Sequence, residues 1–314
     1  MNEITILTYS YGSSPMGSGS SSICLLNFVR LLNEAGYAVN VFSILESLYS
    51  EAKTFKSINK AKEAIDRSFV VHHWSGMNKA FASLCLYAKK NKKKVILGPN
   101  LFDGLDFLNE KNYLNNIKYD KILITNECMI YKLSKNYEIP IDKINVFAVG
   151  PILSEWSSAE KDNFILWKGN AKSSDKDVKF ALELAKRLRG KYNFKFLGHP
   201  RPYKYEEHIK QAKMAKLYIS TSTSEVTGLA LAEQWAAGTP SVTHPKIYQH
   251  GKNYKTGIIA NKTLDDYIEA IEEIMDNEAL WVHLSNGAIE YSDLQFNPER
   301  LLFNYFNKIL GVNQ

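Results

Sequence analysis

Short apolar runs alternate with amphipathic stretches along the whole chain. Ile4–Thr8 and Phe69–His73 are typical of buried strands, because they are short and rich in β-branched or aromatic residues. Between such runs, residues 23–35 place Leu25, Leu26, Val29 and Leu32 at helical spacing, and Gly36 follows as a stop. The pattern also predicts strands at 38–42, 95–97, 121–125 and 145–149, and a helix at 78–90. Strand and helix in regular alternation predict a parallel, doubly wound α/β sheet.

A second alternation begins after a change in composition at residues 150–162, which we interpret as a linker. The predicted domains are therefore 1–152 and 153–314. Strands are predicted at 164–167, 193–197 and 216–220, and helices at 177–189, before Gly238, and at 264–275, 280–291 and 298–310. Ser174 or Asp175 is the expected N-cap of the helix at 177–189. The last helix is free to pack back on the first domain.

Length, composition and charge limit the kinds of protein that this chain can be. The 314 residues suit two domains, and 45% apolar with 23% charged residues exclude a largely disordered chain. Residues 1–150 hold 18 of the 39 basic and 13 of the 33 acidic side chains, so most of the net charge of +6 lies there. This suits an anionic partner but is too weak for a dedicated DNA-binding domain. The densest basic run, Lys89–Lys94, ends a predicted helix, where the dipole favours cations; anionic lipid and nucleic acid are the alternatives.

The cysteines and the N-terminus bear on the compartment. Cys24, Cys85 and Cys128 are an odd, widely spaced set, which indicates buried thiols in a reducing compartment rather than a disulfide framework or a zinc site. The N-terminal residues read as a strand rather than a leader, and no apolar run is long enough to span a bilayer. We therefore expect a cytoplasmic protein.

The segment Ser220–Pro240 carries the clearest chemical signal. A predicted strand enters a Ser/Thr loop, and a helix begins near Gly228. The start of a helix offers unpaired N–H groups and a positive dipole to a phosphate, and glycine lets a ligand approach the backbone. Glu225 precedes the helix and Glu233 lies about one and a half turns inside it. These two carboxylates could bind hydroxyls at the two ends of a ligand whose phosphates lie between them, although an ordinary amphipathic helix with a capping acid is the simpler alternative.

This segment resembles the donor-site motif of retaining GT-B glycosyltransferases of family four, which includes relatives of sucrose and glycogen synthases. The resemblance rests on two Glu with seven residues between them, Gly-Leu among those seven, and an Ala-rich helix that ends on Gly-Thr-Pro. It implies two Rossmann-like domains whose sheets face each other across a cleft. It also implies that Glu225 binds the donor sugar and Glu233 the ribose hydroxyls. The backbone amides implied for the sugar and diphosphate are those of Val226, Thr227, Gly228 and Leu229.

The resemblance extends over nearly the whole chain, with departures. Gly19, in the loop Met16–Ser20, corresponds to the family's glycine-rich N-terminal loop, and Gly198 with His199 to a turn that lines the nucleotide. Asn170 stands where the family has an arginine that neutralises the diphosphate. Lys176 matches the family's lysine if one residue is inserted, and Lys172 or Lys168 could supply the missing charge. His72 or His73 corresponds to a histidine near the acceptor or sugar, and Asn100 replaces a second histidine.

The implied activity is transfer of a hexosyl or pentosyl group from a nucleotide sugar with retention of anomeric configuration. Glu225, Lys176 and His73 form the expected catalytic set; Gly19, Lys172, Gly198, His199, Val226, Thr227, Gly228, Leu229 and Glu233 are expected to bind the donor. No metal or other cofactor is required, and UDP is expected before GDP or ADP. The expected acceptor is a saccharide or lipid-linked saccharide, with peripheral membrane contact through the basic domain left open. A hydroxymethylated DNA base as acceptor, and a nucleotide- or glycan-binding module without catalysis, are the alternatives.

Overall fold

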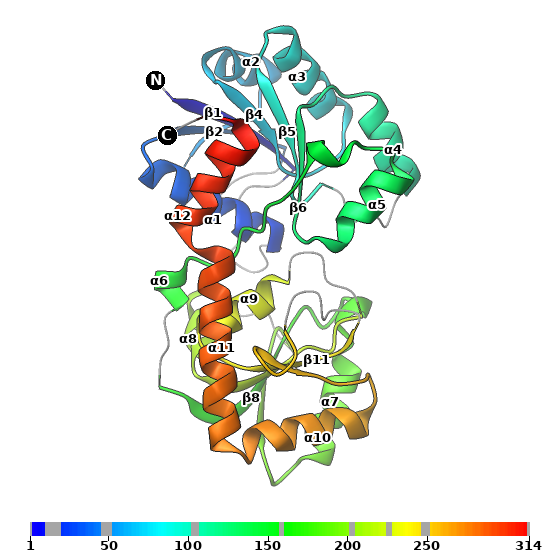
Figure 1. The fold of residues 1–314 in the computed structure, drawn as a ribbon, viewed down its shortest axis with the longest axis vertical. Coiled ribbons are helices and arrows are strands. Elements are labelled where there is room, and N and C mark those ends of the chain that lie inside the picture. Colours follow the sequence, from blue (N-terminus) through cyan, green and yellow to red (C-terminus); the bar gives the residue numbers. More distant parts are fainter. Residues whose placement is uncertain are drawn as a thin grey trace. The chain divides into compact units, whose positions relative to one another are not determined.

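The computed structural model describes residues 2–9, 20–44, 52–101, 107–156, 160–200, 205–223, 228–245 and 252–312. The chain divides into two compact units, 1–149 with 298–314, and 150–297 (Figure 1). Each unit holds one β-sheet in which all described strand pairs are parallel, with helices packed on it. The predicted α/β fold with two parallel sheets is confirmed.

The first unit is built on a seven-stranded sheet in the order β3-β2-β1-β4-β5-β6-β7. Its strands are β1 (Glu3–Thr8), β2 (Ala38–Ser43), β3 (Lys53–Phe55), β4 (Val70–His73), β5 (Lys94–Leu97), β6 (Lys121–Ile124) and β7 (Ile144–Val146). The helices that connect them are α1 (Ser20–Glu34), α2 (Ile58–Arg67), α3 (Lys79–Lys90), α4 (Phe107–Asn115) and α5 (Cys128–Asn136), with a 3₁₀ turn at Ile141–Lys143. The strands β1 to β3 follow one another towards one edge of the sheet. After β3 the chain crosses back to form β4 on the other side of β1, and the later strands continue towards the opposite edge.

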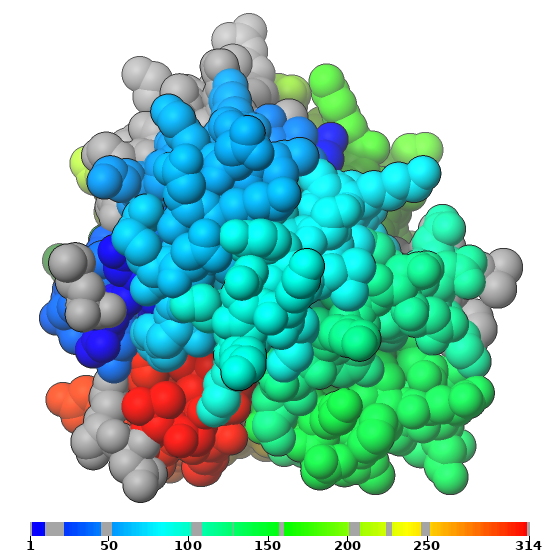
Figure 2. All heavy atoms as spheres, turned by 90° about the horizontal axis from the view of Figure 1, so that it is seen from above, coloured from blue at the N-terminus to red at the C-terminus, as the bar shows by residue number. Residues whose placement is uncertain are grey.

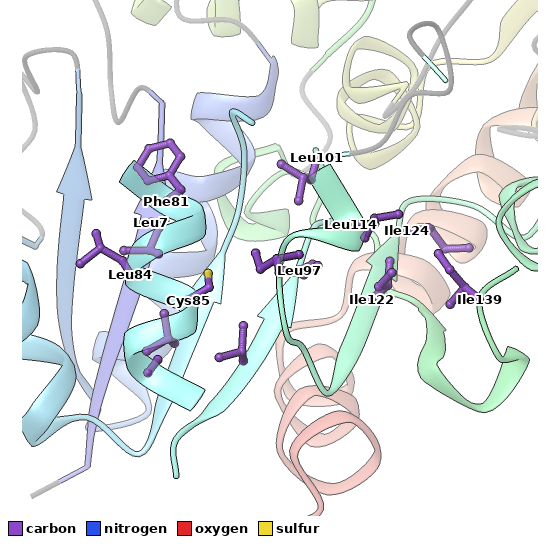
Figure 3. Close-up of a cluster of buried hydrophobic side chains, with 14 of the residues drawn as sticks. Leu7, Phe81, Leu84, Cys85, Leu97, Leu101, Leu114, Ile122, Ile124 and Ile139 are labelled. Atoms are coloured by element: carbon purple, nitrogen blue, oxygen red, sulfur yellow. The ribbon is translucent and has the colours of Figure 1, made fainter. Parts of the chain in front are cut away.

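One core of this unit lies between the sheet and the helices α2, α3 and α4. Figure 3 shows Leu84 and Cys85 of α3 beside Leu7 of β1 and Leu97 of β5, all buried. Asn78 caps α3 by accepting a hydrogen bond from the Phe81 amide (3.0 Å), which fixes where the helix begins. The strands read as continuous apolar runs because both faces of the sheet are covered.

The C-terminal residues complete the first unit. The helix α12 (Pro298–Phe303) continues into a π-helical turn at Asn304–Leu310, and these residues lie against the blue and cyan surface of the unit (Figure 2). Phe306 stacks on Tyr37 with ring centres 4.3 Å apart. The Lys94 ammonium donates to the Leu310 carbonyl, so one lysine of the basic run binds the last residue of the π-helical turn.

The second unit is built on a five-stranded sheet in the order β12-β11-β10-β8-β9. Its strands are β8 (Asp162–Lys168), β9 (Asn193–Leu197), β10 (Ala215–Ile219), β11 (Ser241–Thr243) and β12 (Gly257–Ile259). Its helices are α6 (Leu153–Trp156), α7 (Val178–Arg187), α8 (Tyr205–Lys213), α9 (Leu229–Ala236), α10 (Leu264–Met275) and α11 (Glu278–Phe296). Alternate residues of β8 enter two cores: Ile165 and Trp167 pack with α7 and α10, and Phe164 and Leu166 with α6 and α9.

The structure differs from the prediction at several places. Asp177, not Ser174 or Asp175, caps α7, because Ser174–Lys176 form a 3₁₀ turn and the Asp177 side chain accepts from the Phe180 amide (3.4 Å). The predicted linker contains α6, whose Trp156 is buried. The prediction missed β3, β11, α2, α4, α5 and α8.

Candidate functional site

The candidate site lies at the carboxyl ends of β8 and β10. The chain passes from β8 to β9 on one side of it and then to β10 on its other side, so β8 and β10 flank a topological switch point. Ligands of open parallel sheets bind at such a point. The loop that follows β8 contains Lys172 and Lys176, and the loop that follows β10 leads to Gly228 and α9. Because β8 and β10 are adjacent, the loops that contain Lys172 and Lys176 and that lead to Gly228 start at the same edge of the sheet.

Helix α9 begins at Gly228, whose φ of 59° lies in the left-handed region that glycine adopts without strain. Leu229, the first residue of the helix, is buried. Glycine therefore suits the backbone conformation that the chain adopts where α9 starts. Glu225, Val226 and Thr227 lie outside the described residues, so their predicted roles stay predictions.

Glu233 points from α9 into a buried cluster of polar groups. Its side chain is 1% exposed and forms an ion pair with the Lys168 ammonium. His208 Nε2, on α8, lies 3.7 Å from Glu233 Oε2. Burial alone would raise the pKa of the Glu233 carboxyl, but the Lys168 charge and the His208 ring outweigh burial and lower this pKa. The site therefore holds an ionised carboxylate beneath the surface.

Burial and the neighbouring Lys168 charge lower the pKa of His208. Its ring meets the Trp156 ring edge to face, with centres 6.3 Å apart. The cluster thus pairs one anion with one cation beside a histidine for which the neutral form is favoured. Sequence reasoning missed His208 and Trp156, because α8 was not predicted and α6 was interpreted as linker.

Hydrogen bonds join the loop after β10 to the loop after β8. Thr221 Oγ1 accepts from Trp167 Nε1 (2.9 Å) and donates to the Lys176 carbonyl (2.8 Å). The Thr223 amide donates to the Asp175 carbonyl (2.7 Å). These bonds fix the backbone at Lys176. The hydroxyls in the Ser/Thr loop are therefore partly structural, which the sequence did not reveal.

The predicted phosphate-binding lysines differ in their surroundings. The Lys176 ammonium lies 3.4 Å from Asp175 Oδ2 and its side chain is 23% exposed. Lys172 is exposed, and its amide donates to Asn170 Oδ1 (3.1 Å). Asn170, which replaces the expected arginine, is thus engaged in a local turn. Lys168 is committed to Glu233, so Lys176 and Lys172 are the lysines of this loop whose ammonium groups lie nearer to solvent.

Gly198 follows β9 and packs directly on the loop after β8. Its φ is 94°, and a Cβ built at this position would lie nearer than 3.0 Å to the Gly169 carbonyl oxygen. His199 lies beside Phe196, with ring centres 6.4 Å apart. The predicted glycine-rich turn therefore contacts the loop that contains Lys172 and Lys176, and only glycine fits without displacing that loop.

His72 and His73 both lie in the core of the first unit. His72 Nε2 is 2.6 Å from the Gly98 carbonyl and its Nδ1 is 3.1 Å from Tyr305 Oη. His73 Nε2 is 2.9 Å from the Gly76 carbonyl and its Nδ1 is 3.2 Å from Tyr113 Oη. Burial lowers the pKa of His72 to about 3 and of His73 to about 4. Direct catalysis by His73 stays a prediction, and it would require one of these hydrogen bonds to open.

Other predicted features can be placed where they are described. Gly19 lies outside the described residues. Asn100 is partly buried, and its Nδ2 has no hydrogen-bond partner within the described structure. In the basic run, the Lys89 ammonium pairs with Asp120 (2.8 Å) and that of Lys93 donates to the Asp66 carbonyl (2.7 Å). Lys94, the first residue of β5, donates to the Leu310 carbonyl, so three of the five lysines in this run make contacts within the first unit.

Within the described residues, no group of three or more His, Cys, Asp or Glu side chains is arranged to hold a metal ion. Cys24 and Cys85 are buried free thiols, and burial raises the pKa of Cys85; the Cys128 side chain is not described. None of the described helices is both long and apolar enough to cross a bilayer.

Known proteins share this architecture. HepE of Anabaena, solved in complex with UDP, superposes with a TM-score of 0.77 at 10% identity, over 99% of this chain and 100% of that one. A glycosyltransferase from Rickettsia africae gives 0.75 at 16% identity over 99% of both chains. Sucrose-phosphate synthase from Thermosynechococcus elongatus gives 0.72 at 12% identity over 99% and 100%.

The chain has the GT-B fold. Residues 174–291 also match the model of the family "Glycosyl transferases group 1". This segment includes Lys176, Gly198, His208 and the whole of α9 with Glu233, so the family match overlaps the candidate site, whose Lys168 and Lys172 precede it. No curated protein matches the chain. The GT-B likeness agrees with the family match, and the two together support a glycosyltransferase.

Proposed function

We propose that this GT-B protein transfers a sugar from a nucleotide-sugar donor, with UDP as the nucleotide, to an acceptor hydroxyl with retention of configuration. The observation that carries the proposal is the buried Glu233, paired with Lys168, at the switch point of the second sheet. It lies on the helix that begins at Gly228, where a diphosphate would meet backbone N–H groups. A carboxylate at this depth accepts hydrogen bonds from ribose hydroxyls.

In the proposed reaction, the bond between the anomeric carbon and the diphosphate breaks while the acceptor oxygen attacks from the same face. The departing diphosphate oxygen takes the acceptor proton, so no enzymic nucleophile is needed. The chain's own contribution is positioning and charge stabilisation. Glu225 would hold the sugar hydroxyls, and Lys176, with Lys172 near it in sequence, would neutralise the charge that grows on the diphosphate.

Uridine as the base is supported by neighbours with the same fold. HepE has been solved with UDP, with UDP and glucose, and with UDP-glucose. TarM of S. aureus has been solved with UDP, fondaparinux and a GlcNAc-glycerol. WaaG takes part in lipopolysaccharide biosynthesis. We therefore propose a saccharide or lipid-linked saccharide acceptor.

A second candidate is a nucleotide-binding module without catalysis. It is favoured by Asn170, which occupies the position of the expected arginine and hydrogen-bonds within its own loop. Binding and turnover separate the two candidates, because the module would bind a nucleoside diphosphate but would neither hydrolyse nor transfer the sugar.

The first test is a thermal-shift and calorimetric panel of UDP, GDP and ADP, followed by turnover of the matching nucleotide sugars. Binding to the folded state raises the apparent melting temperature by mass action. We expect a response to UDP, and sugar release from UDP-sugars that Glu225→Ala abolishes while the fold persists.

Glu269→Ala is the matched control, because Glu269 is an exposed carboxylate on α10. It should leave both binding and turnover unchanged. Absence of binding to every nucleotide in the panel would refute the proposal. Binding without turnover would favour the module, and turnover that survives in Glu225→Ala would refute the role of Glu225.

A further inference from the structure

Lys168 is the last residue of β8, and its charge is directed towards Glu233. The ammonium pairs with Glu233 Oε2, and the lysine side chain is 17% exposed. The same ammonium lies 5.9 Å from the centre of the ring of Trp156, the buried residue of α6. Because Lys168 pairs with Leu197 across the sheet, strand register fixes where its side chain begins. A residue held this way cannot easily reorient to follow a ligand.

We propose that Lys168 is a positioning residue: it keeps the Glu233 carboxylate ionised and aimed at the ribose hydroxyls, and it thereby determines the preference for ribonucleotides over deoxyribonucleotides. This inference rests on the proposed function, which assigns the ribose to Glu233. It goes beyond that function by giving Lys168 a role that acts through another side chain and involves no contact with the nucleotide.

The physical reason is the cost of an unpaired charge in a buried place. A carboxylate without a counter-ion in such a site takes up a proton or turns towards water. Of the described titratable groups, Lys168 on β8 and His208 on α8 face Glu233. Helix α6 contributes Trp156 and α11 packs Tyr291 on Trp235, while the Lys161 ammonium donates to the Ala237 carbonyl at the far end of α9. Burial and the Lys168 charge lower the pKa of His208 and so favour its neutral form. Lys168 is therefore the positively charged partner of Glu233 in this cluster.

The competing interpretation is that Lys168 binds the diphosphate directly in place of the missing arginine. The two roles differ in which part of the nucleotide they affect. If Lys168 is a positioning residue, its removal weakens the binding of uridine as well as UDP and reduces the ratio of affinities between UDP and 2′,3′-dideoxy-UDP. If Lys168 contacts the phosphates, its removal weakens the binding of UDP and dideoxy-UDP by the same factor and spares uridine.

The experiment measures the dissociation constants of UDP, 2′,3′-dideoxy-UDP and uridine by calorimetry on the full chain. In the unmodified protein we expect UDP to bind about tenfold or more tighter than its dideoxy analogue, because hydrogen bonds to a charged acceptor are lost. Lys168→Met should bring this ratio close to one, and Lys168→Arg should keep it. Lys186→Met is the matched control, because Lys186 is an exposed lysine near the end of α7 with no role in the candidate site, and it should leave the ratio unchanged.

The outcomes separate the hypotheses. A ratio that persists in Lys168→Met overturns the inference, whether or not UDP affinity falls. If Lys168→Met does not fold, Lys168→Gln replaces it, and failure of both to fold shows a purely structural role and also overturns the inference. If the unmodified protein binds no nucleoside diphosphate, the proposed function fails first. If it binds UDP but Lys168→Met behaves like the control, the inference alone fails.

Discussion

Gly198→Ala should damage the second unit more than a change at any ordinary loop glycine. Gly198 and Gly190 have nearly the same backbone conformation, with φ of 94° and 89°. A Cβ at Gly190 meets no atom within 4 Å, whereas a Cβ at Gly198 would collide with the Gly169 carbonyl. Gly190→Ala therefore measures backbone strain alone, and Gly198→Ala measures strain together with the collision. The difference in unfolding free energy between the two variants therefore measures the cost of the collision between the two loops.

The magnitudes follow from these two contributions. An alanine in the left-handed region costs about 1 kcal/mol of folding free energy. Forcing extra volume against a packed backbone adds about 1–3 kcal/mol. We therefore expect a free-energy loss of about 1 kcal/mol for Gly190→Ala and about 3 kcal/mol for Gly198→Ala. For a unit of this size the melting temperature should fall by about 2–4 °C and about 6–12 °C respectively.

Urea unfolding followed by tryptophan fluorescence is a suitable assay, because four of the five tryptophans, Trp156, Trp167, Trp235 and Trp281, lie in the second unit. UDP affinity is measured alongside, since displacement of Gly169 moves the loop that carries Lys172 and Lys176. We expect Gly198→Ala to weaken UDP binding and Gly190→Ala to leave it intact. Equal unfolding midpoints and equal affinities for the two variants would refute the reasoning.

Two further predictions concern buried ionisable groups. His73 has its pKa lowered to about 4, so below its ordinary value of 6.5 the unfolded chain binds a proton that the folded chain does not. His73 should thus lower the stability of the first unit by up to about 3 kcal/mol between pH 6.5 and pH 4, and His72, whose pKa is lowered to about 3, should lower it by a similar amount. His73→Asn should therefore reduce this slope by about half in pH-dependent urea unfolding; an unchanged slope would contradict the assignment. Lys161 donates to the Lys213 and Ala237 carbonyls and to Thr239 Oγ1, at 2.6–2.8 Å. Lys161→Met should cost about 2–3 kcal/mol by leaving these acceptors unsatisfied, and calorimetric unfolding that matches the unmodified protein would show that water replaces the lysine.

Local patterns predicted most of the architecture. The apolar run at residues 164–167 was predicted as a strand, and β8 spans Asp162–Lys168. The helix predicted at residues 264–275 has the bounds of α10, where Thr263 accepts a hydrogen bond from the Asp266 amide (3.2 Å). Strands buried on both faces and capped helices carry their signal in a few neighbouring residues. Of the missed elements, β3 spans only three residues, so its pairing with β2 rather than a local pattern decides its conformation.

Within the candidate site, the sequence by itself determined which residue types are present: a glycine at the start of a helix, a glutamate one and a half turns later, and lysines after a strand. Only the tertiary structure decided how they pair. Lys168 and Glu233 are far apart in sequence and are joined because β8 lies next to β10 in the sheet. His72 and His73 end a strand, where a ligand could have been expected, yet the fold gives both rings internal hydrogen-bond partners. The physical reason is that chain spacing fixes local conformation, whereas the burial and charge of a side chain depend on the strands and helices packed around it.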